Sequence, residues 1–132
     1  MLEQVVEHEL FSNVFLSSAD SYVARCNSHA ITMAGNRVVL NVTLIQSTGA
    51  ESGDTLTLQV EGSYEGQVWK TGSLGSVVYT LLTESPPDNK TISVAIDDID
   101  YAYMRLSADL SDAGGASTVQ VLFSASIVCS EQ

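Results

Sequence analysis

Basic side chains are scarce in this chain of 132 residues. Five Lys and Arg stand against sixteen Asp and Glu, which gives a formal net charge of −11. The basic residues are Arg25, Arg37, Lys70, Lys90 and Arg105, and no two of them lie close in sequence. Nucleic-acid-binding proteins and proteins held on anionic membranes carry clustered Lys and Arg. The charge therefore argues against nucleic acid and membrane as partners, and suits solubility or a basic or multivalent partner.

Long apolar runs are also missing. No stretch approaches the roughly 18 residues of a transmembrane helix, and the first residues, MLEQ, lack the basic and apolar regions of a signal peptide. We therefore expect a protein that is used inside a cell, or that leaves it by lysis or another route outside the Sec pathway.

Cysteine and histidine are too few for a zinc site, with two of each in the chain. The motifs of a serine nucleophile elbow and of a phosphate-binding loop are absent as well. We predict a protein that is not an enzyme and needs no cofactor. Cys26 and Cys129 lie near opposite ends of the sequence. Terminal strands of a sandwich can lie side by side, so a disulfide is possible, but two buried free thiols are favoured in a reducing compartment.

Carboxylates are densest at Asp97, Asp98 and Asp100. Calcium prefers several oxygen ligands, which loops of β-sandwiches often supply. The spacing is not that of an EF-hand loop, and the three acids could instead solvate a turn between two strands. We favour the solvated turn and keep these residues as weak metal candidates.

Apolar and polar residues alternate over most of the chain after residue 20. Five segments show this period of two, and Ser76–Thr83 is a probable sixth. The inward-facing residues are predicted to be Val38, Leu40, Val42 and Leu44; Leu56, Leu58 and Val60; Ile92, Val94 and Ile96; Ala102, Met104, Leu106 and Ala108; and Val119, Val121, Phe123, Ala125 and Ile127. Such alternation is typical of antiparallel sheets with one covered face.

Turn-forming residues separate these segments at 47–54, 84–89 and 111–116, and the last of these, with Gly114 and Gly115, favours a hairpin. Short strands at such spacing predict an all-β, antiparallel, jelly-roll-like sandwich. The apolar fraction of 45% and the length suit one folded domain.

The first twenty residues have a different pattern, which fits helical spacing and extended structure about equally. We assign residues 1–20 to an N-terminal arm and residues 21–132 to the sandwich. Either the arm docks on its own domain or it reaches a neighbouring molecule. Its candidate partner-binding residues are Leu10, Phe11, Val14, Phe15 and Leu16.

One pair of segments resembles a known family. The segment LQVEGSYEGQVW at 58–69 is followed about thirty residues later by YAYMRL at 101–106. This layout is similar to that of discoidin-like (galactose-binding-like) jelly rolls, with Glu65 where that family has Asp. It also looks like small β-sandwich structural proteins of tailed bacteriophages, including capsid decoration proteins.

The resemblance implies that Trp69 folds back over one end of the core, beside the strand that carries Arg105. Trp69 and the inward face of that strand would then be core rather than ligand contacts. Cys26 and Cys129 are placed like the cysteines that join the two ends of secreted discoidin domains. The missing signal peptide disfavours a secreted lectin and favours a virion component that is made in the host cytoplasm.

Two hypotheses follow. The first is a virion structural protein, such as a capsid decoration (cement) or head-associated protein. Its partners would be the major capsid protein or other virion proteins, and it would form a homo-oligomer, with a trimer favoured. The alternative is a carbohydrate-binding module of discoidin-like type. That module would use exposed aromatic residues in a pocket at the loop end of the domain, and its candidates are Tyr22, Tyr64, Tyr101 and Tyr103.

Overall fold

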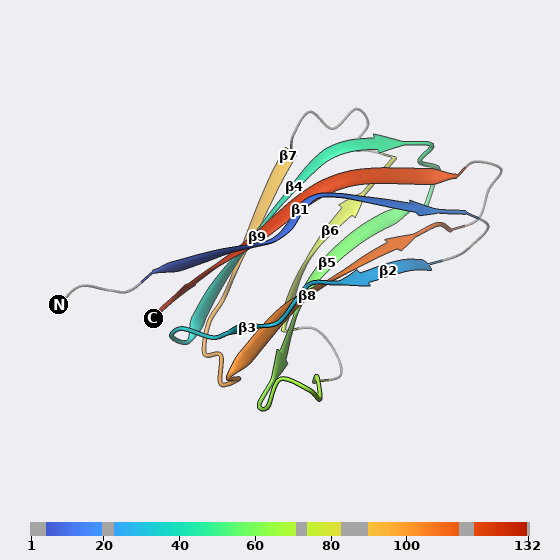
Figure 1. The fold of residues 1–132 in the computed structure, drawn as a ribbon. Coiled ribbons are helices and arrows are strands. Elements are labelled where there is room, and N and C mark those ends of the chain that lie inside the picture. Colours follow the sequence, from blue (N-terminus) through green and yellow to red (C-terminus); the bar gives the residue numbers. More distant parts are fainter. Residues whose placement is uncertain (1–4, 20–22, 71–73, 83–89, 114–117, 132) are drawn as a thin grey trace.

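The computed structural model is a sandwich of two antiparallel sheets (Figure 1). It describes residues 5–19, 23–70, 74–82, 90–113 and 118–131. The strands in this part of the chain are β1 (Val6–Ser18), β2 (Val23–Asn27), β3 (Ile31–Thr32), β4 (Arg37–Thr48), β5 (Thr55–Ser63), β6 (Gly75–Thr80), β7 (Lys90–Ile96), β8 (Tyr103–Ser111) and β9 (Val119–Ser130). Sheet A has the order β1-β9-β4-β7, and sheet B has the order β2-β8-β5-β6 with β3 also paired to β8. The predicted all-β antiparallel sandwich is confirmed.

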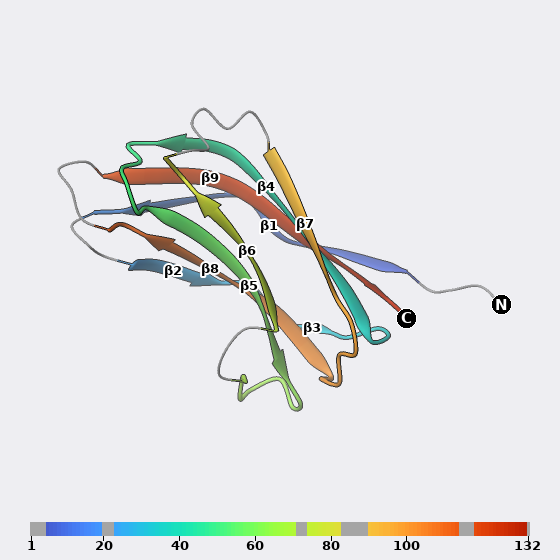
Figure 2. The ribbon, with the colours of Figure 1, turned by 180° about the vertical axis from the view of Figure 1, so that it is seen from behind.

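The core lies between the sheets and contains most of the predicted inward-facing residues. Those of β4, β5 and β9 are all nearly or fully buried, whereas Ile92, Val94 and Ile96 of the edge strand β7 are half-buried. Burying one such aliphatic side chain contributes about 1.5–3 kcal/mol. Tyr79 of β6 is also fully buried, and its hydroxyl lies 2.8 Å from the carbonyl oxygen of Val42 and 2.9 Å from that of Lys90. This side chain therefore links β6 to both β4 and β7, and β6 and β7 are the edge strands of the two sheets on the same edge of the sandwich (Figure 2).

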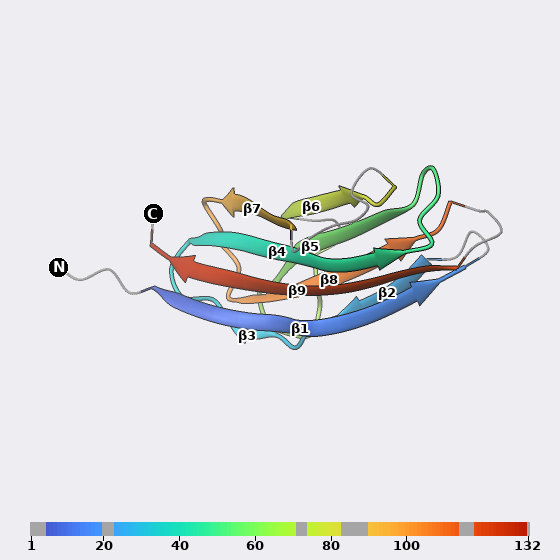
Figure 3. The ribbon, with the colours of Figure 1, turned by 90° about the horizontal axis from the view of Figure 1, so that it is seen from above.

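The predicted arm is an edge strand of the sandwich. β1 pairs with β9 from Val6 to Ser18, and Figure 3 shows the two strands running side by side across the molecule. Of the two alternatives for the arm, the structure therefore has the one in which it docks on its own domain. A boundary at residue 20 does not separate an arm from the sandwich, because β1 is one of its strands.

An irregular register explains why the pattern of this strand was ambiguous. The pairing of β1 with β9 shifts between Glu9 and Phe11 and again between Phe11 and Val14, and Asn13 has a φ of 49°. A β-bulge adds a residue on one strand and so breaks the period of two. The adjacent residues Leu10 and Phe11 are consequently both buried, and the ring of Phe11 packs edge-on against Phe123 with centroids 5.5 Å apart.

The connection after β8 differs from the predicted hairpin. β8 pairs with β2, β3 and β5, whereas β9 pairs with β1 and β4, so the chain crosses between the sheets. Gly114 and Gly115 lie outside the described residues, as does the predicted turn at 84–89. At this end of the sandwich the buried carboxylate of Asp54 accepts hydrogen bonds from the backbone N–H groups of Glu51, at 2.8 Å, and Ala113, at 2.9 Å. Asp54 thereby ties together two connections that each cross from one sheet to the other.

In the described residues no helix is present, and so none that is long and apolar enough to cross a membrane.

Candidate functional site

The acidic residues considered for calcium lie in the connection from β7 to β8. The side chains of Asp97, Asp98 and Asp100 are exposed, and Asp97 pairs with Arg37 at 3.4 Å. Ile99 between them is buried, and its N–H donates to the carbonyl of Asn36 at 2.8 Å. Across the described ranges, no group of three or more His, Cys, Asp and Glu side chains is arranged to hold a metal ion.

The two cysteines are on different sheets and are not bridged. Cys26 lies in β2 of sheet B and is half-buried, whereas Cys129 lies in β9 of sheet A and is fully buried. Removal from water disfavours a thiolate, so burial raises the pKa of both thiols. Neither cysteine has the lowered pKa that would activate a nucleophile.

The outer side of sheet B, called face B here, is crossed by ion pairs. Arg25 and Asp109 form a bidentate pair, with Nε–Oδ1 at 2.6 Å and Nη2–Oδ2 at 3.0 Å. The hydrogen bonds and charge of Asp109 raise the pKa of Arg25. On the same face, Nε of Arg105 donates to Oε1 of Glu61 at 2.8 Å. The charges of face B are therefore largely neutralised within the sheet.

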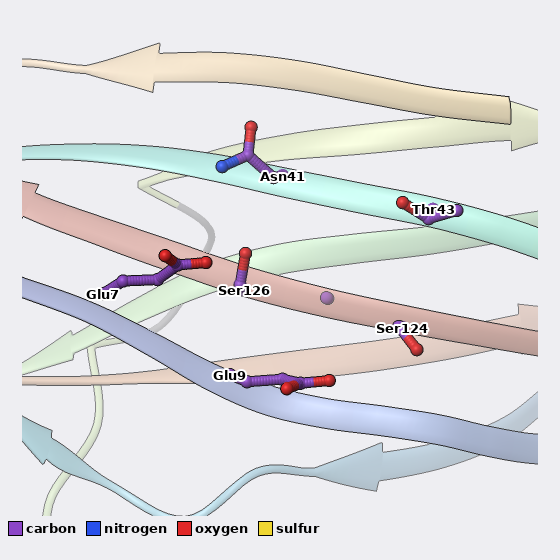
Figure 4. Close-up of a pocket in the computed structure, with 7 residues that line it drawn as sticks. Glu7, Glu9, Asn41, Thr43, Ser124 and Ser126 are labelled. Carbon is purple, nitrogen blue, oxygen red and sulfur yellow. The ribbon is translucent and has the colours of Figure 1, made fainter. Parts of the chain in front are cut away.

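The outer side of sheet A, called face A, carries small polar side chains and two glutamates. A hollow of about 260 Å³ lies on this face. Figure 4 shows that the side chains around it come from three neighbouring strands. The labelled residues are Glu7 and Glu9 of β1, Asn41 and Thr43 of β4, and Ser124 and Ser126 of β9. In the part of the chain that the structure describes, neither glutamate has an ion-pair partner.

Short hydrogen bonds fix the small polar side chains of face A. The Oγ1 atoms of Thr43 and Thr91 lie 2.9 Å apart, and Ser93 donates to Oδ1 of Asn41 at 2.5 Å. These contacts join β4 to β7 across the outer surface. The face offers carboxylates and hydroxyls to solvent.

Phe15 is the exposed member of the predicted arm contacts. Its side chain is 58% exposed and lies beside Leu122 at a second, smaller hollow on face A. Val14 and Leu16 are half-buried against the core. Leu10 and Phe11 are buried in the core of the sandwich, because the bulge in β1 turns both of them inward. The prediction that these two residues contact a partner is therefore corrected.

A cluster of exposed and half-buried apolar and aromatic residues occupies the end of the sandwich where the β5–β6 loop meets the β7–β8 connection. We call Tyr64, Val68, Trp69 and Tyr101 the aromatic cluster. The rings of Tyr64 and Tyr101 lie with centroids 4.6 Å apart, and the cluster borders a hollow of about 240 Å³. Tyr64 is 66% exposed and Val68 is 70% exposed.

The loop that carries Tyr64 and Val68 is held in one conformation by a buried serine. The hydroxyl of Ser63 donates to the carbonyl of Val68 at 2.6 Å and accepts from the N–H of Gly66 at 2.8 Å. Gly66 has a φ of 86°, which favours glycine. A Cβ atom on Gly62 would lie 2.6 Å from the ring of Tyr101, so only glycine lets this ring pack on the strand.

Trp69 is not part of the core, in contrast to what the family resemblance implied. It is half-buried on the outer side of sheet B, and the guanidinium of Arg105 lies 4.4 Å from its ring centroid. Arg105 points outward because its neighbours Met104 and Leu106 point into the core. Trp69 therefore lies at the surface beside Arg105, with which it forms a cation–π contact.

The structure brings only some of the predicted sugar-binding residues together. Tyr64 and Tyr101 are brought together, Tyr103 is half-buried with its ring against Gly66, and Tyr22 lies outside the described residues. Val68 and Lys70 were missed, although Lys70 Nζ lies 5.7 Å from the ring centroid of Tyr101. The sequence feature that could have pointed to this site is Val68, an apolar residue within a turn-rich segment.

Comparison with known proteins establishes the fold. No family model matches the sequence, and no curated protein matches it. Among solved structures, the PBSX exported protein XepA is similar with a TM-score of 0.56 and 13% identity, and the match covers 96% of this chain and 38% of that chain. VP2 in the subviral particle of infectious bursal disease virus is similar with a TM-score of 0.57 and 12% identity, over 96% of this chain and 33% of that one.

This chain spans less than half the length of either of those proteins. The C-terminal CBM6 of the laminarinase LamC from Zobellia galactanivorans is also similar, with a TM-score of 0.46, 14% identity and coverage of 93% of this chain and 98% of that one. A TM-score below 0.5 does not establish a shared fold. The predicted resemblance therefore holds at the level of a jelly-roll β-sandwich fold, and no family is assigned.

Proposed function

We propose that this chain is a non-catalytic virion structural protein, a capsid decoration or head-associated protein that coats or stabilises a viral shell. The observation that carries the proposal is the similarity in fold, over 96% of the chain, to XepA and to VP2 of a viral particle. The partner would be the major capsid protein or another virion protein, and the location would be the virion.

The charge distribution supports this proposal. A net charge of −11, with two glutamates on face A that no ion pair among the described residues reaches, makes free copies repel one another. A decoration protein gains from this, because it must stay dispersed until it meets its shell. On a symmetric shell each weak contact is repeated, so an oligomer such as a trimer gains avidity without a large interface per copy.

Attachment to purified shells tests the proposal. Shells isolated from the source without this chain are mixed with the purified protein, sedimented and assayed for bound copies, while light scattering gives the native mass. We expect saturable attachment at a fixed number of copies per shell, and shells that resist heating better. Absence of co-sedimentation at both low and high salt would contradict the proposal.

A carbohydrate-binding module remains the second candidate, because the exposed Tyr64 and the half-buried Tyr101 border a hollow at the loop end. Trp69, the single tryptophan, lies in the same cluster and serves as a fluorescence reporter. A glycan panel should then change Trp69 fluorescence in the original protein and not in Tyr64→Ser. A panel without any response would remove this candidate.

A further inference from the structure

We propose that the aromatic cluster and the neighbouring acidic connection form one docking surface, and that its occupant is a protein surface with an apolar socket rimmed by Lys or Arg. The inference rests on the proposed function, which makes a shell protein the occupant. It replaces the N-terminal arm as the main contact element, since most of that segment's apolar side chains face the core.

The apolar part of this surface is presented by a loop of fixed shape. Tyr64 and Val68 are two of the most exposed large apolar side chains among the described residues. The loop between them is closed by Ser63, and the N–H of Lys70 donates to the carbonyl of Gly62 at 2.9 Å. The loop backbone therefore loses little conformational entropy when this edge is covered, and preorganisation of this kind favours binding.

The arrangement of the aromatic rings suits insertion into a pocket of a partner better than stacking of a sugar on a ring face. Tyr101 packs against Gly62 and Tyr64 and has the ammonium of Lys70 near its ring, and Trp69 has Arg105 over its ring. Part of each ring is therefore already covered by contacts within the chain. What protrudes is the edge formed by Tyr64 and Val68, which suits a socket on a protein partner. Tyrosine and tryptophan are also enriched at the energetic centres of protein interfaces.

Carboxylates border this edge on the side of the β7–β8 connection. Asp98 and Asp100 line a hollow of about 230 Å³ together with Tyr64, Tyr101 and Lys70, and Glu65 is exposed in the loop itself, so the carboxylates outnumber the single ammonium there. The charge of Asp100 raises the pKa of Tyr64. An apolar centre with an acidic rim is complementary to an apolar socket with a basic rim.

Matched double variants test the proposal on shells that lack this chain. Tyr64→Ser with Val68→Ser removes the protruding edge, and Val23→Ser with Val78→Ser is the control, because those valines are exposed on face B. All four positions are exposed, so both variants should unfold at denaturant concentrations close to that of the original protein. We expect the first variant to attach roughly tenfold more weakly or worse, and the control to attach within about twofold of the original protein.

The acidic rim is tested separately with Asp98→Asn and Asp100→Asn, which should reduce the dependence of attachment on salt. Equal attachment of the Tyr64/Val68 variant and the original protein would overturn this inference and leave the proposed function standing. Failure of the original protein to attach would overturn both. An oligosaccharide that binds at Trp69 and leaves shell attachment unchanged would assign the cluster to sugar and also overturn the inference.

Discussion

Face B neutralises its acids within the sheet, with Arg25 against Asp109 and Arg105 against Glu61, whereas on face A no ion pair reaches Glu7 or Glu9 among the described residues. The difference shows how five basic residues are distributed in a chain with sixteen acids. Cations on face B stabilise the fold, and the excess charge is left where it keeps copies apart. Among the described residues, Tyr64 and Val68 at the loop end are more exposed than any large apolar side chain on either face.

The largest predicted change in stability distinguishes the inward-facing from the outward-facing side chains of β1. Phe11→Ala deletes a buried ring that packs against Phe123, so we expect unfolding to become easier by about 3–5 kcal/mol. Phe15→Ala, four residues along the same strand, removes a mainly exposed ring and should change stability by less than about 0.5 kcal/mol. Urea unfolding followed by circular dichroism measures both. Equal losses would mean that β1 is not seated in this register.

A smaller effect should distinguish the charges of the two faces. Asp109→Ala leaves Arg25 without its bidentate partner, and we expect a loss of about 1 kcal/mol, because the guanidinium is largely exposed. Glu9→Gln on face A breaks no ion pair seen in the described residues and should be nearly neutral or slightly stabilising. Urea midpoints in low and in high salt provide the measurement. A loss for Asp109→Ala that salt does not reduce would contradict an electrostatic origin.

The smallest effect concerns the thiols of the two sheets. Burial raises the pKa of Cys26 and Cys129, so the unfolded chain releases these protons first as the pH rises. Their contribution to stability is therefore complete below the unfolded thiol pKa of about 8.5 and is lost as the pH rises through the folded pKa.

A thiol reagent at pH 8 should modify Cys26 of the edge strand slowly and Cys129 only after unfolding. Cys26→Ser isolates the second thiol and serves as the control. Rapid reaction of that variant under native conditions would show that β9 is more open than the structure has it.

The sequence predicted the parts of the fold in which one face of a strand is buried without interruption. In β4 and β9 the alternation of apolar residues translates directly into buried and exposed positions. It was ambiguous in β1, because a bulge places Leu10 and Phe11 on the same side. It also could not show that β8 and β9 belong to different sheets, since a glycine-rich connection permits both a hairpin and a crossover.

The candidate site was less predictable, because it depends on which way single side chains turn. Tryptophan has a large, mostly apolar side chain and was expected in the core, yet Trp69 stacks on Arg105 at the surface. Tyr64 and Tyr101 are 37 positions apart in sequence and meet only through the fold. Their contact also depends on Gly62, where any side chain would displace the ring of Tyr101.

The pairing of β1 with β9 has a practical consequence for experiments on attachment. Val6 lies opposite Cys129, and Cys129 in turn lies opposite Val38, next to the β7–β8 connection (Figure 1). A fluorescent protein or affinity tag fused at these strand ends would therefore lie at the end of the sandwich that holds the β7–β8 connection, so attachment is best measured with the untagged protein. The turn at 49–53 lies at the far end of the sandwich, but a label there would disturb the hydrogen bonds by which Asp54 holds Glu51 and Ala113.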